Sequence, residues 1–115
     1  MNILDEDISI PECERLRAHK IHFRQIGVEI GISGMKDHEE VIPLLHQLKR
    51  PTFFTLDHGF SRPRLLHPGY CLVFLDIWED EAAEYIRRFL RHAAFCTRSQ
   101  RMGKVVHLRH SNVSY

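Results

Sequence analysis

Three aspartates each end a short apolar run of this chain. The runs at residues 2–4, 52–56 and 71–75 finish in leucine, and the next residue is Asp5, Asp57 or Asp76. Carboxylates gathered in one place repel one another unless a cation neutralises them. Oxygen-only ligands suit Mg²⁺ or Mn²⁺, and such an ion can activate water and stabilise a phosphate group during transfer. We therefore expect these aspartates to form a site for Mg²⁺ or Mn²⁺.

The elements that must position the aspartates follow from the hydrophobic pattern. Short β-branched and aromatic runs bounded by Pro and Gly predict buried strands, and apolar stripes of helical period predict helices. Strands that alternate with helices indicate an α/β fold with a mostly parallel central sheet, flanked by helices and joined by right-handed crossovers. In such a sheet the ends of the strands meet at one edge, where ligands bind. The strands expected are 1–5, 21–24, 52–57, 70–76 and 104–109, and the helices 11–18, 37–50 and about 79–95.

Other side chains could complete the acidic edge. A fourth acid would come from the start of the second helix, as Asp37, Glu39 or Glu40. The histidine after Asp57, His58, could orient a phosphate or water, and two arginines in the next loop, Arg62 and Arg64, could hold a phosphodiester backbone. The alternative is that an Asp after a strand forms a turn or caps a helix, and that the arginines are solvated surface charge.

Composition limits the classes of function. The chain has 115 residues, which suits a single domain, 1–115, and its hydrophobic fraction of 43% predicts a folded core. The net charge of +1 excludes a strongly basic nucleic-acid binder. Basic residues nevertheless crowd the segment 87–104 and could form a strip for RNA or an acidic partner protein, although helix-end charge balance explains several of them.

The remaining motifs point to no other chemistry. Three widely spaced cysteines fit neither a disulfide framework nor a zinc knuckle. The glycines of segment 27–34 lack the order of a dinucleotide-binding loop. No apolar stretch is long enough to span a bilayer and no signal peptide is visible, so we expect no membrane association and a cytoplasmic location. A serine three residues before Glu12, Ser9, predicts a capped helix start.

Three ordered stretches resemble the small bacterial PIN-like family. They are I-L-D-E-D-I at residues 3–8, G-M-K-D-H-E-E-V at 34–41 and F-T-L-D-H-G-F at 54–60. The family typically reads L-D-E-N-L, then G-x-x-D-x-E-I, then V-T-x-D-x-D-F, followed by a strand, a long helix and a terminal strand. The resemblance covers nearly the whole chain in order and spacing.

The resemblance implies a PIN-like nuclease fold and a metal-dependent ribonuclease site. Such a protein is often the toxin of a toxin–antitoxin pair, so the implied partners are single-stranded RNA and a cognate antitoxin, with a homodimer as a further arrangement. By position, Asp5, Asp37 and Asp57 match the family acids, and Glu6 matches the second acid of the first motif. The chain departs from the pattern at Gly59, which replaces the second acid of the third motif.

Two alternatives stay open. A receiver-like signalling domain also places acids after its first strand and an Asp after its third; Asp5, Asp7 and Asp57 could play these parts, with Mg²⁺ bound and phosphate accepted on Asp57. Receivers also have a Ser or Thr at the end of the fourth strand and a Lys at the end of the fifth, which this chain lacks. The other alternative is a PIN-like protein that binds a partner without catalysis.

Overall fold

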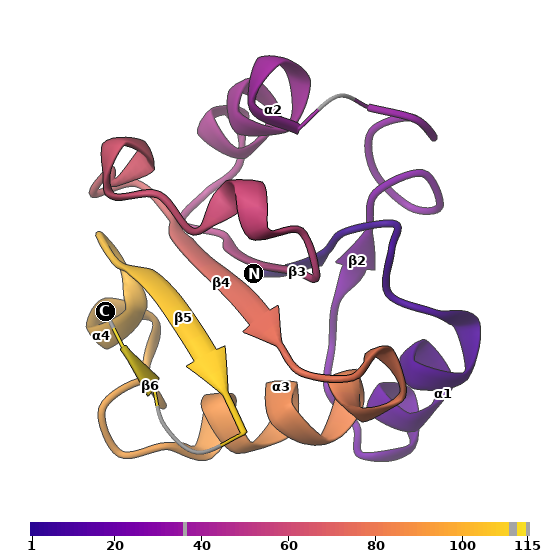
Figure 1. The fold of residues 1–115 in the computed structure, drawn as a ribbon. Helices are drawn as coiled ribbons and strands as arrows, with labels where there is room; N and C mark the ends of the chain where they lie inside the picture. The colour runs from indigo at the N-terminus through magenta and orange to yellow at the C-terminus, as the bar shows by residue number, and fades with distance from the viewer. Residues whose placement is uncertain (36, 111–112, 115) are drawn as a thin grey trace.

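A single six-stranded sheet runs through the molecule (Figure 1). The computed structural model describes residues 1–35, 37–110 and 113–114, without the side chains of residues 37, 38, 113 and 114. The strand order is β2-β1-β3-β4-β5-β6; the first five strands of this order are parallel, and β6 is antiparallel to β5. The strands are β1 (Asn2–Leu4), β2 (Arg24–Gln25), β3 (Thr52–Thr55), β4 (Cys71–Asp76), β5 (Val105–Arg109) and β6 (Val113–Ser114).

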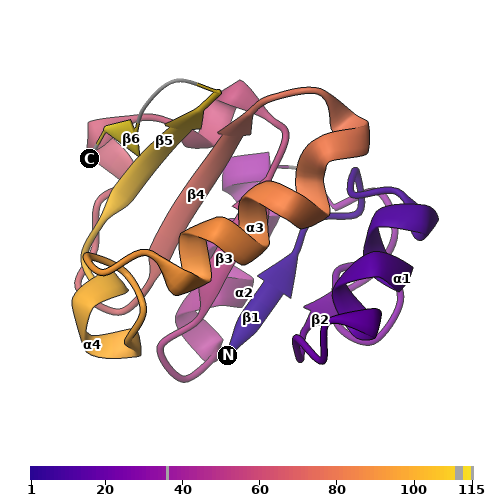
Figure 2. The same cartoon turned by 90° about the horizontal axis from the view of Figure 1, so that it is seen from below.

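Helices cover both faces of this sheet. Helix α1 and helix α3 lie on one face, and α2 lies on the other together with the short helices that join β3 to β4 (Figures 1 and 2). The predicted α/β class with a parallel sheet flanked by helices is confirmed. The helices are α1 (Ile10–Ala18), the π-helix η1 (Asp37–Val41), α2 (Ile42–Gln47), the 3-10 helices η2 (His58–Phe60), η3 (Pro63–Leu65) and η4 (Glu79–Glu81), α3 (Ala82–Arg91) and α4 (Arg98–Arg101).

The alternation of side chains along the strands builds two cores. In β3, Phe54 packs toward α1 and α3, whereas Phe53 packs toward α2 and η2. In β4, Val73 and Leu72 divide in the same way, and all four side chains are fully buried. Because both faces of these strands are covered, their sequences are continuously apolar rather than alternating.

One crossover has the opposite hand to the one expected. Helices α1 and α3 cover the same face, yet the step from β1 to β2 and the step from β4 to β5 run in opposite directions across the sheet (Figure 2). The two crossovers therefore differ in hand, and β4–α3–β5 is left-handed, against the usual rule. The other face over β4 is already filled by Phe60, Tyr70 and Leu65 from the β3–β4 connection, so α3 packs beside α1.

A buried carboxylate joins these two helices. Glu12 was expected to cap its own helix with Ser9, but Ser9 makes no side-chain capping bond. Glu12 is instead 1% exposed, and its Oε1 accepts a 2.9 Å hydrogen bond from the backbone N–H of Ala83 in the first turn of α3. Its Oε2 pairs with Arg15 at 2.6 Å. The acidic side chain thus satisfies a free N–H group at the start of α3 rather than of α1.

Several element boundaries differ from the expected ones. The second strand lies at Arg24–Gln25, later than the predicted 21–24. The third helix ends at Arg91, and the polar segment after Cys96 forms α4, which Thr97 caps by accepting from the N–H of Gln100. Boundaries of this kind depend on caps and on tertiary contacts more than on periodicity.

Candidate functional site

The candidate site lies where β1 and β3 end side by side. From β1 the chain crosses to β2 on one side of the sheet, and from β3 it crosses to β4 on the other side. The strand order therefore reverses between β1 and β3. Ligands of open α/β sheets bind at this position. The side chains gathered there are Asp5 and Asp7 after β1 and Thr55 and Asp57 at the end of β3; we call this group the acid pocket.

The hydroxyl of Thr55 is the centre of the acid pocket. It donates a 2.7 Å hydrogen bond to Oδ2 of Asp5 and lies 3.5 Å from Oδ2 of Asp7. It also accepts a 3.0 Å bond from the backbone N–H of Asp57. Thr55 is fully buried, so one fixed side chain contacts the carboxylates of Asp5 and Asp7 and the backbone of Asp57.

Backbone N–H groups hold the carboxylates in place as well. The N–H of Glu6 donates to Asp5 at 2.8 Å, and the N–H of Leu56 donates to Asp7 at 3.2 Å. Asp57 accepts from the N–H of Gly59 at 2.8 Å and thereby caps η2. The turn and capping roles considered as alternatives are therefore present, and the charge of Asp57 still acts on both Asp5 and Asp7.

The carboxyl groups are held in an environment that disfavours their charge. Partial burial is the main cause: it raises the pKa of Asp5 and raises the pKa of Asp7 to about 7. The charge of Asp57 acts in the same direction on both groups, while the bonds from Thr55 and the backbone act against it. Asp7 therefore keeps its proton to a higher pH than an ordinary aspartate, and a bound cation would relieve the same repulsion.

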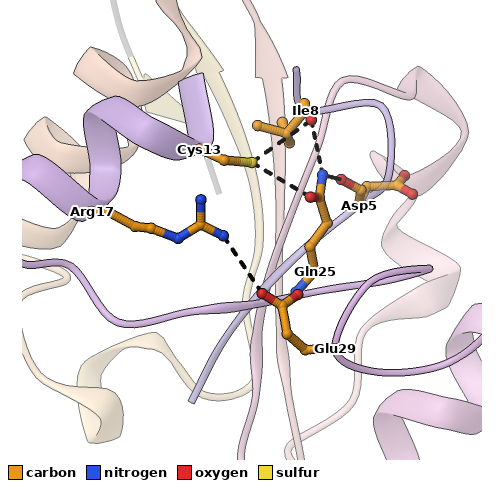
Figure 3. A network of polar contacts seen from close by, with 6 residues as sticks. All are labelled: Asp5, Ile8, Cys13, Arg17, Gln25 and Glu29. Atoms are coloured by element: carbon orange, nitrogen blue, oxygen red, sulfur yellow. Dashed lines mark hydrogen bonds and ion pairs between the residues drawn. The ribbon is translucent and has the colours of Figure 1, made fainter. Parts of the chain in front are cut away.

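A network around Gln25 supports the segment that carries Asp5 and Asp7 (Figure 3). The Gln25 amide nitrogen donates to the backbone carbonyls of Asp5, at 3.1 Å, and Ile8, at 2.8 Å. Its carbonyl oxygen accepts from the thiol of Cys13 at 3.5 Å.

Glu29 accepts from the backbone N–H of Gln25 at 3.0 Å and pairs with Arg17 at 3.6 Å. The turn after β1 is thus braced from β2 and α1.

Glu6 does not reach the acid pocket. Its carboxylate accepts bonds from the hydroxyl of Ser33, at 3.0 Å, and from the N–H of Gly34, at 2.6 Å. A Cβ on Gly27 would lie only 3.1 Å from the same carboxylate, and Gly27 has a positive φ of 85°. The predicted metal ligand Glu6 instead anchors the glycine-containing loop beside the site.

Asp76 lies at the same edge of the sheet but faces a different partner. Its carboxylate bonds to the His107 ring at 2.9 Å, and this hydrogen bond lowers the pKa of Asp76. Arg109 is its register partner on β5 and lies 3.2 Å from the His107 ring. As predicted, β1, β3 and β4 are parallel neighbours, but Asp76 bonds to His107 and does not join the other three acids.

The other predicted site residues spread along the edge. The His58 ring packs edge-on against Phe74 with 5.4 Å between centroids, next to the His107 side of β4. Arg62 and Arg64 are exposed around η3, and neither forms an ion pair with the acid pocket in the described part of the chain. The side chain of Asp37 lies outside the described residues.

One basic residue of segment 87–104, Arg101, cannot belong to a surface strip. Arg101 is buried, and its guanidinium donates to the Thr52 hydroxyl and to the Phe95 carbonyl, each at 2.9 Å. It therefore ties α4 to the start of β3. Arg88 pairs with Glu84 of the same helix at 2.9 Å.

Thr55 was missed as a site residue, and Asp7 was named only for the receiver-like alternative. Asp7 follows Asp5 by two positions in a tight turn, and Thr55, the last residue of β3, precedes Asp57 by two positions. The i, i+2 spacing places Thr55 and Asp57 on the same side of an extended chain, which is the signal that could have found Thr55. Asp7 depends on the turn closed by the Ile8 N–H and the Asp5 carbonyl at 3.2 Å.

Comparison with known proteins gives no further assignment. No protein-family model, curated protein or solved structure matches the chain. Among the described residues, no helix is long and apolar enough to cross a membrane, and no group of three or more His, Cys, Asp or Glu side chains is placed so that it could hold a metal ion.

Proposed function

We propose that this protein is a metal-dependent ribonuclease of PIN-like type, with the acid pocket as its centre. The observation that carries the proposal is the position of Asp5, Asp7 and Asp57 around Thr55, at the edge of a parallel sheet where ligands bind: the Thr55 hydroxyl contacts the carboxylates of Asp5 and Asp7 and the backbone N–H of Asp57. The raised pKa values of Asp5 and Asp7 support it, because groups tuned in this way cluster at functional sites.

The chemistry of the donors fits Mg²⁺ or Mn²⁺. All three side chains offer carboxylate oxygens, and Asp5 and Asp7 gain from any charge that offsets their repulsion. Mg²⁺ is usually held by one or two carboxylates together with water and substrate phosphate, not by a closed protein cage. A bound cation would supply a water of lowered pKa and charge stabilisation at the phosphate.

The protein's own groups would orient the reaction. Asp5 and Asp57 are the proposed metal ligands, and Asp7, whose carboxylate lies beside them at the Thr55 hydroxyl, is the proposed acceptor of a proton from the attacking water. His58, exposed beside Asp57, and Arg62 and Arg64 on the adjoining loop are the proposed contacts to the phosphodiester. Hydrolysis would break the bond between phosphorus and the leaving sugar oxygen while water adds its hydroxyl to phosphorus.

The role as a toxin with an antitoxin partner is also part of the proposal. The resemblance to PIN-like toxins supports a cytoplasmic toxin whose site is covered by a cognate antitoxin. The near-neutral net charge of +1 indicates weak, salt-sensitive RNA binding in the absence of further contacts.

Cleavage of labelled single-stranded RNA tests the proposal. Purified protein with Mn²⁺ should cut the RNA, and EDTA or Asp57→Asn should abolish cutting. The asparagine keeps the cap on η2, so the variant should melt at or above the temperature of the wild type. Equal cleavage by both proteins would show a contaminating nuclease, and no cleavage by either would favour a non-catalytic binding protein.

A receiver-like phosphoacceptor is the second candidate. The strand order of the five parallel strands and the acids after β1 and β3 favour it. The left-handed β4–α3–β5 crossover argues against it, since right-handed winding would place that helix on the α2 face. Treatment with acetyl phosphate and Mg²⁺ should leave Asp57 unmodified by mass spectrometry; an acid-stable, hydroxylamine-labile phosphate on Asp57 would favour the receiver.

A further inference from the structure

An exposed tryptophan follows β4 at the same edge of the sheet as the acid pocket. Trp78 follows β4, and 72% of its surface is exposed. A cavity of about 330 Å³ opens at this position, lined by Asp76, Ile77, Trp78, Arg109 and His110. Its size is at the lower end for sites that hold small ligands.

The walls of this cavity are held by two hydrogen-bonded groups. One oxygen of Glu81 accepts both the backbone N–H of Trp78, at 3.1 Å, and the His110 ring, at 2.6 Å. The His110 ring in turn packs edge-on against Tyr85. On the other side, Asp76 bonds to His107, which lies against Arg109. The residues around the exposed indole are therefore linked to the ends of β4, β5 and α3.

We propose that this cavity is a subsite in which one base of single-stranded RNA stacks on Trp78. This inference rests on the proposed ribonuclease function and names the group that positions its substrate. Aromatic rings bind unpaired bases through their faces with little regard to sequence, and arginine adds to such stacking. Trp78 and Arg109 supply this pair.

The charges of the cavity favour a base over a phosphate. Asp76 and Glu81 both have pKa values lowered by their histidine partners, so both remain negative and oppose a phosphate. The flat, uncharged face of a base is not opposed in this way. The phosphate of the same strand would lie toward the acid pocket, where the proposed cation sits.

A protein partner fits the cavity less well. The cores of protein interfaces are depleted of charged residues and bury about 800 Å² on each partner. Here the exposed residues around Trp78 are Asp76, Arg109 and His110, which are charged or polar. The strand order places β4 directly beside β3, so a short RNA strand along this edge passes from the acid pocket to Trp78.

The protein provides its own probe because Trp78 is the only tryptophan of the chain. A ten-nucleotide single-stranded RNA is titrated into the Asp57→Asn protein in EDTA, so that nothing is cut. Tryptophan fluorescence should be quenched in step with binding measured by anisotropy of the labelled RNA. Trp78→Ala should weaken binding by roughly 5- to 100-fold, and Trp78→Phe by much less. His19→Ala, at an exposed side chain after the last turn of α1 and away from the edge where β1 and β3 end, should bind as the parent does.

Cleavage kinetics separate this subsite from the proposed activity. In the active protein, Trp78→Ala should raise KM and leave kcat within about twofold, as expected for lost substrate binding. Quenching without any cleavage by the wild type would support the subsite and reject the ribonuclease. RNA binding and cleavage with unchanged Trp78 fluorescence and an unaffected alanine variant would overturn the subsite alone. Absence of RNA binding, or quenching only by a purified protein partner, would also overturn it.

Discussion

Replacement of Asp7 by asparagine should stabilise the protein at neutral and alkaline pH. The asparagine side chain keeps an oxygen to accept the Leu56 N–H, which lies 3.2 Å from the aspartate. What it removes is a charge that partial burial and the neighbouring Asp5 and Asp57 disfavour. Substitution of a site residue is thus expected to increase the free energy of unfolding, as is common where a site is built at a cost in stability.

The magnitude follows from the pKa of Asp7. A shift from the ordinary value of 3.8 to about 7 corresponds in full to about 4 kcal/mol. Asp7 is partly exposed to solvent, and solvent screening reduces the expected gain to about 1–2 kcal/mol. For a domain of this size that gain raises the melting temperature by roughly 4–10 °C.

The pH dependence has a definite sign. An unfolded aspartate loses its proton near pH 3.8, whereas folded Asp7 keeps it up to about pH 7. Between these values folded Asp7 binds more protons than unfolded Asp7, so the contribution of Asp7 to wild-type stability falls as pH rises from about 4 to 7 and then levels. The difference between Asp7→Asn and the wild type should therefore be near zero at pH 4 and fully developed at pH 8.

Urea unfolding at pH 4, 6 and 8 in EDTA measures this difference. Asp80→Asn is the matched control, because Asp80 is an exposed aspartate in η4, and it should change stability by less than about 0.5 kcal/mol at each pH. If the Asp7→Asn protein is no more stable than the wild type at pH 8, burial and the neighbouring carboxylates do not disfavour the charge of Asp7, and the reasoning is refuted.

Two further predictions concern the cation and the joint between helices. Mn²⁺ at about ten times its dissociation constant should stabilise the wild type by about 1.4 kcal/mol. The double variant with Asp5→Asn and Asp57→Asn should show no rise in melting temperature. If Mn²⁺ leaves the melting temperature of the wild type unchanged, the protein has no competent metal site. Glu12→Ala should lower the free energy of unfolding in urea by about 1–3 kcal/mol, because the Ala83 N–H and Arg15 lose their acceptor. Glu12→Gln should lower it less. Equal losses in the two variants would contradict a role for the Glu12–Ala83 bond.

The repeated Leu-Asp endings were sufficient to predict the parallel sheet and the edge at which the site lies. Local pattern fixes which runs are buried strands, and the rule for strand ends then gathers their last residues. Asp5 and Asp57 were found in this way. Asp76 was placed at the correct edge, but its pairing with His107 depends on the register of β4 against β5, which no local pattern specifies.

Other features depend on contacts between segments far apart in the chain. Gln25 braces the turn of Asp5 from 20 residues away, and Glu12 caps a helix 71 residues further on. The sequence around each of these two side chains gives no sign of the distant contact. The left-handed crossover escaped prediction for the same reason, because it reflects which face of the sheet was already filled.

The left-handed crossover has a consequence for the order in which the chain folds. A β–α–β unit of the usual hand can assemble from its own sequence, whereas the core under α3 combines β4 and β5 with α1 and with the first strands of the chain. We expect the first half of the sheet to form before α3 docks, which would give α3 little structure in the folding transition state. Variants in the α1–α3 contact should then mainly accelerate unfolding and leave the refolding rate almost unchanged.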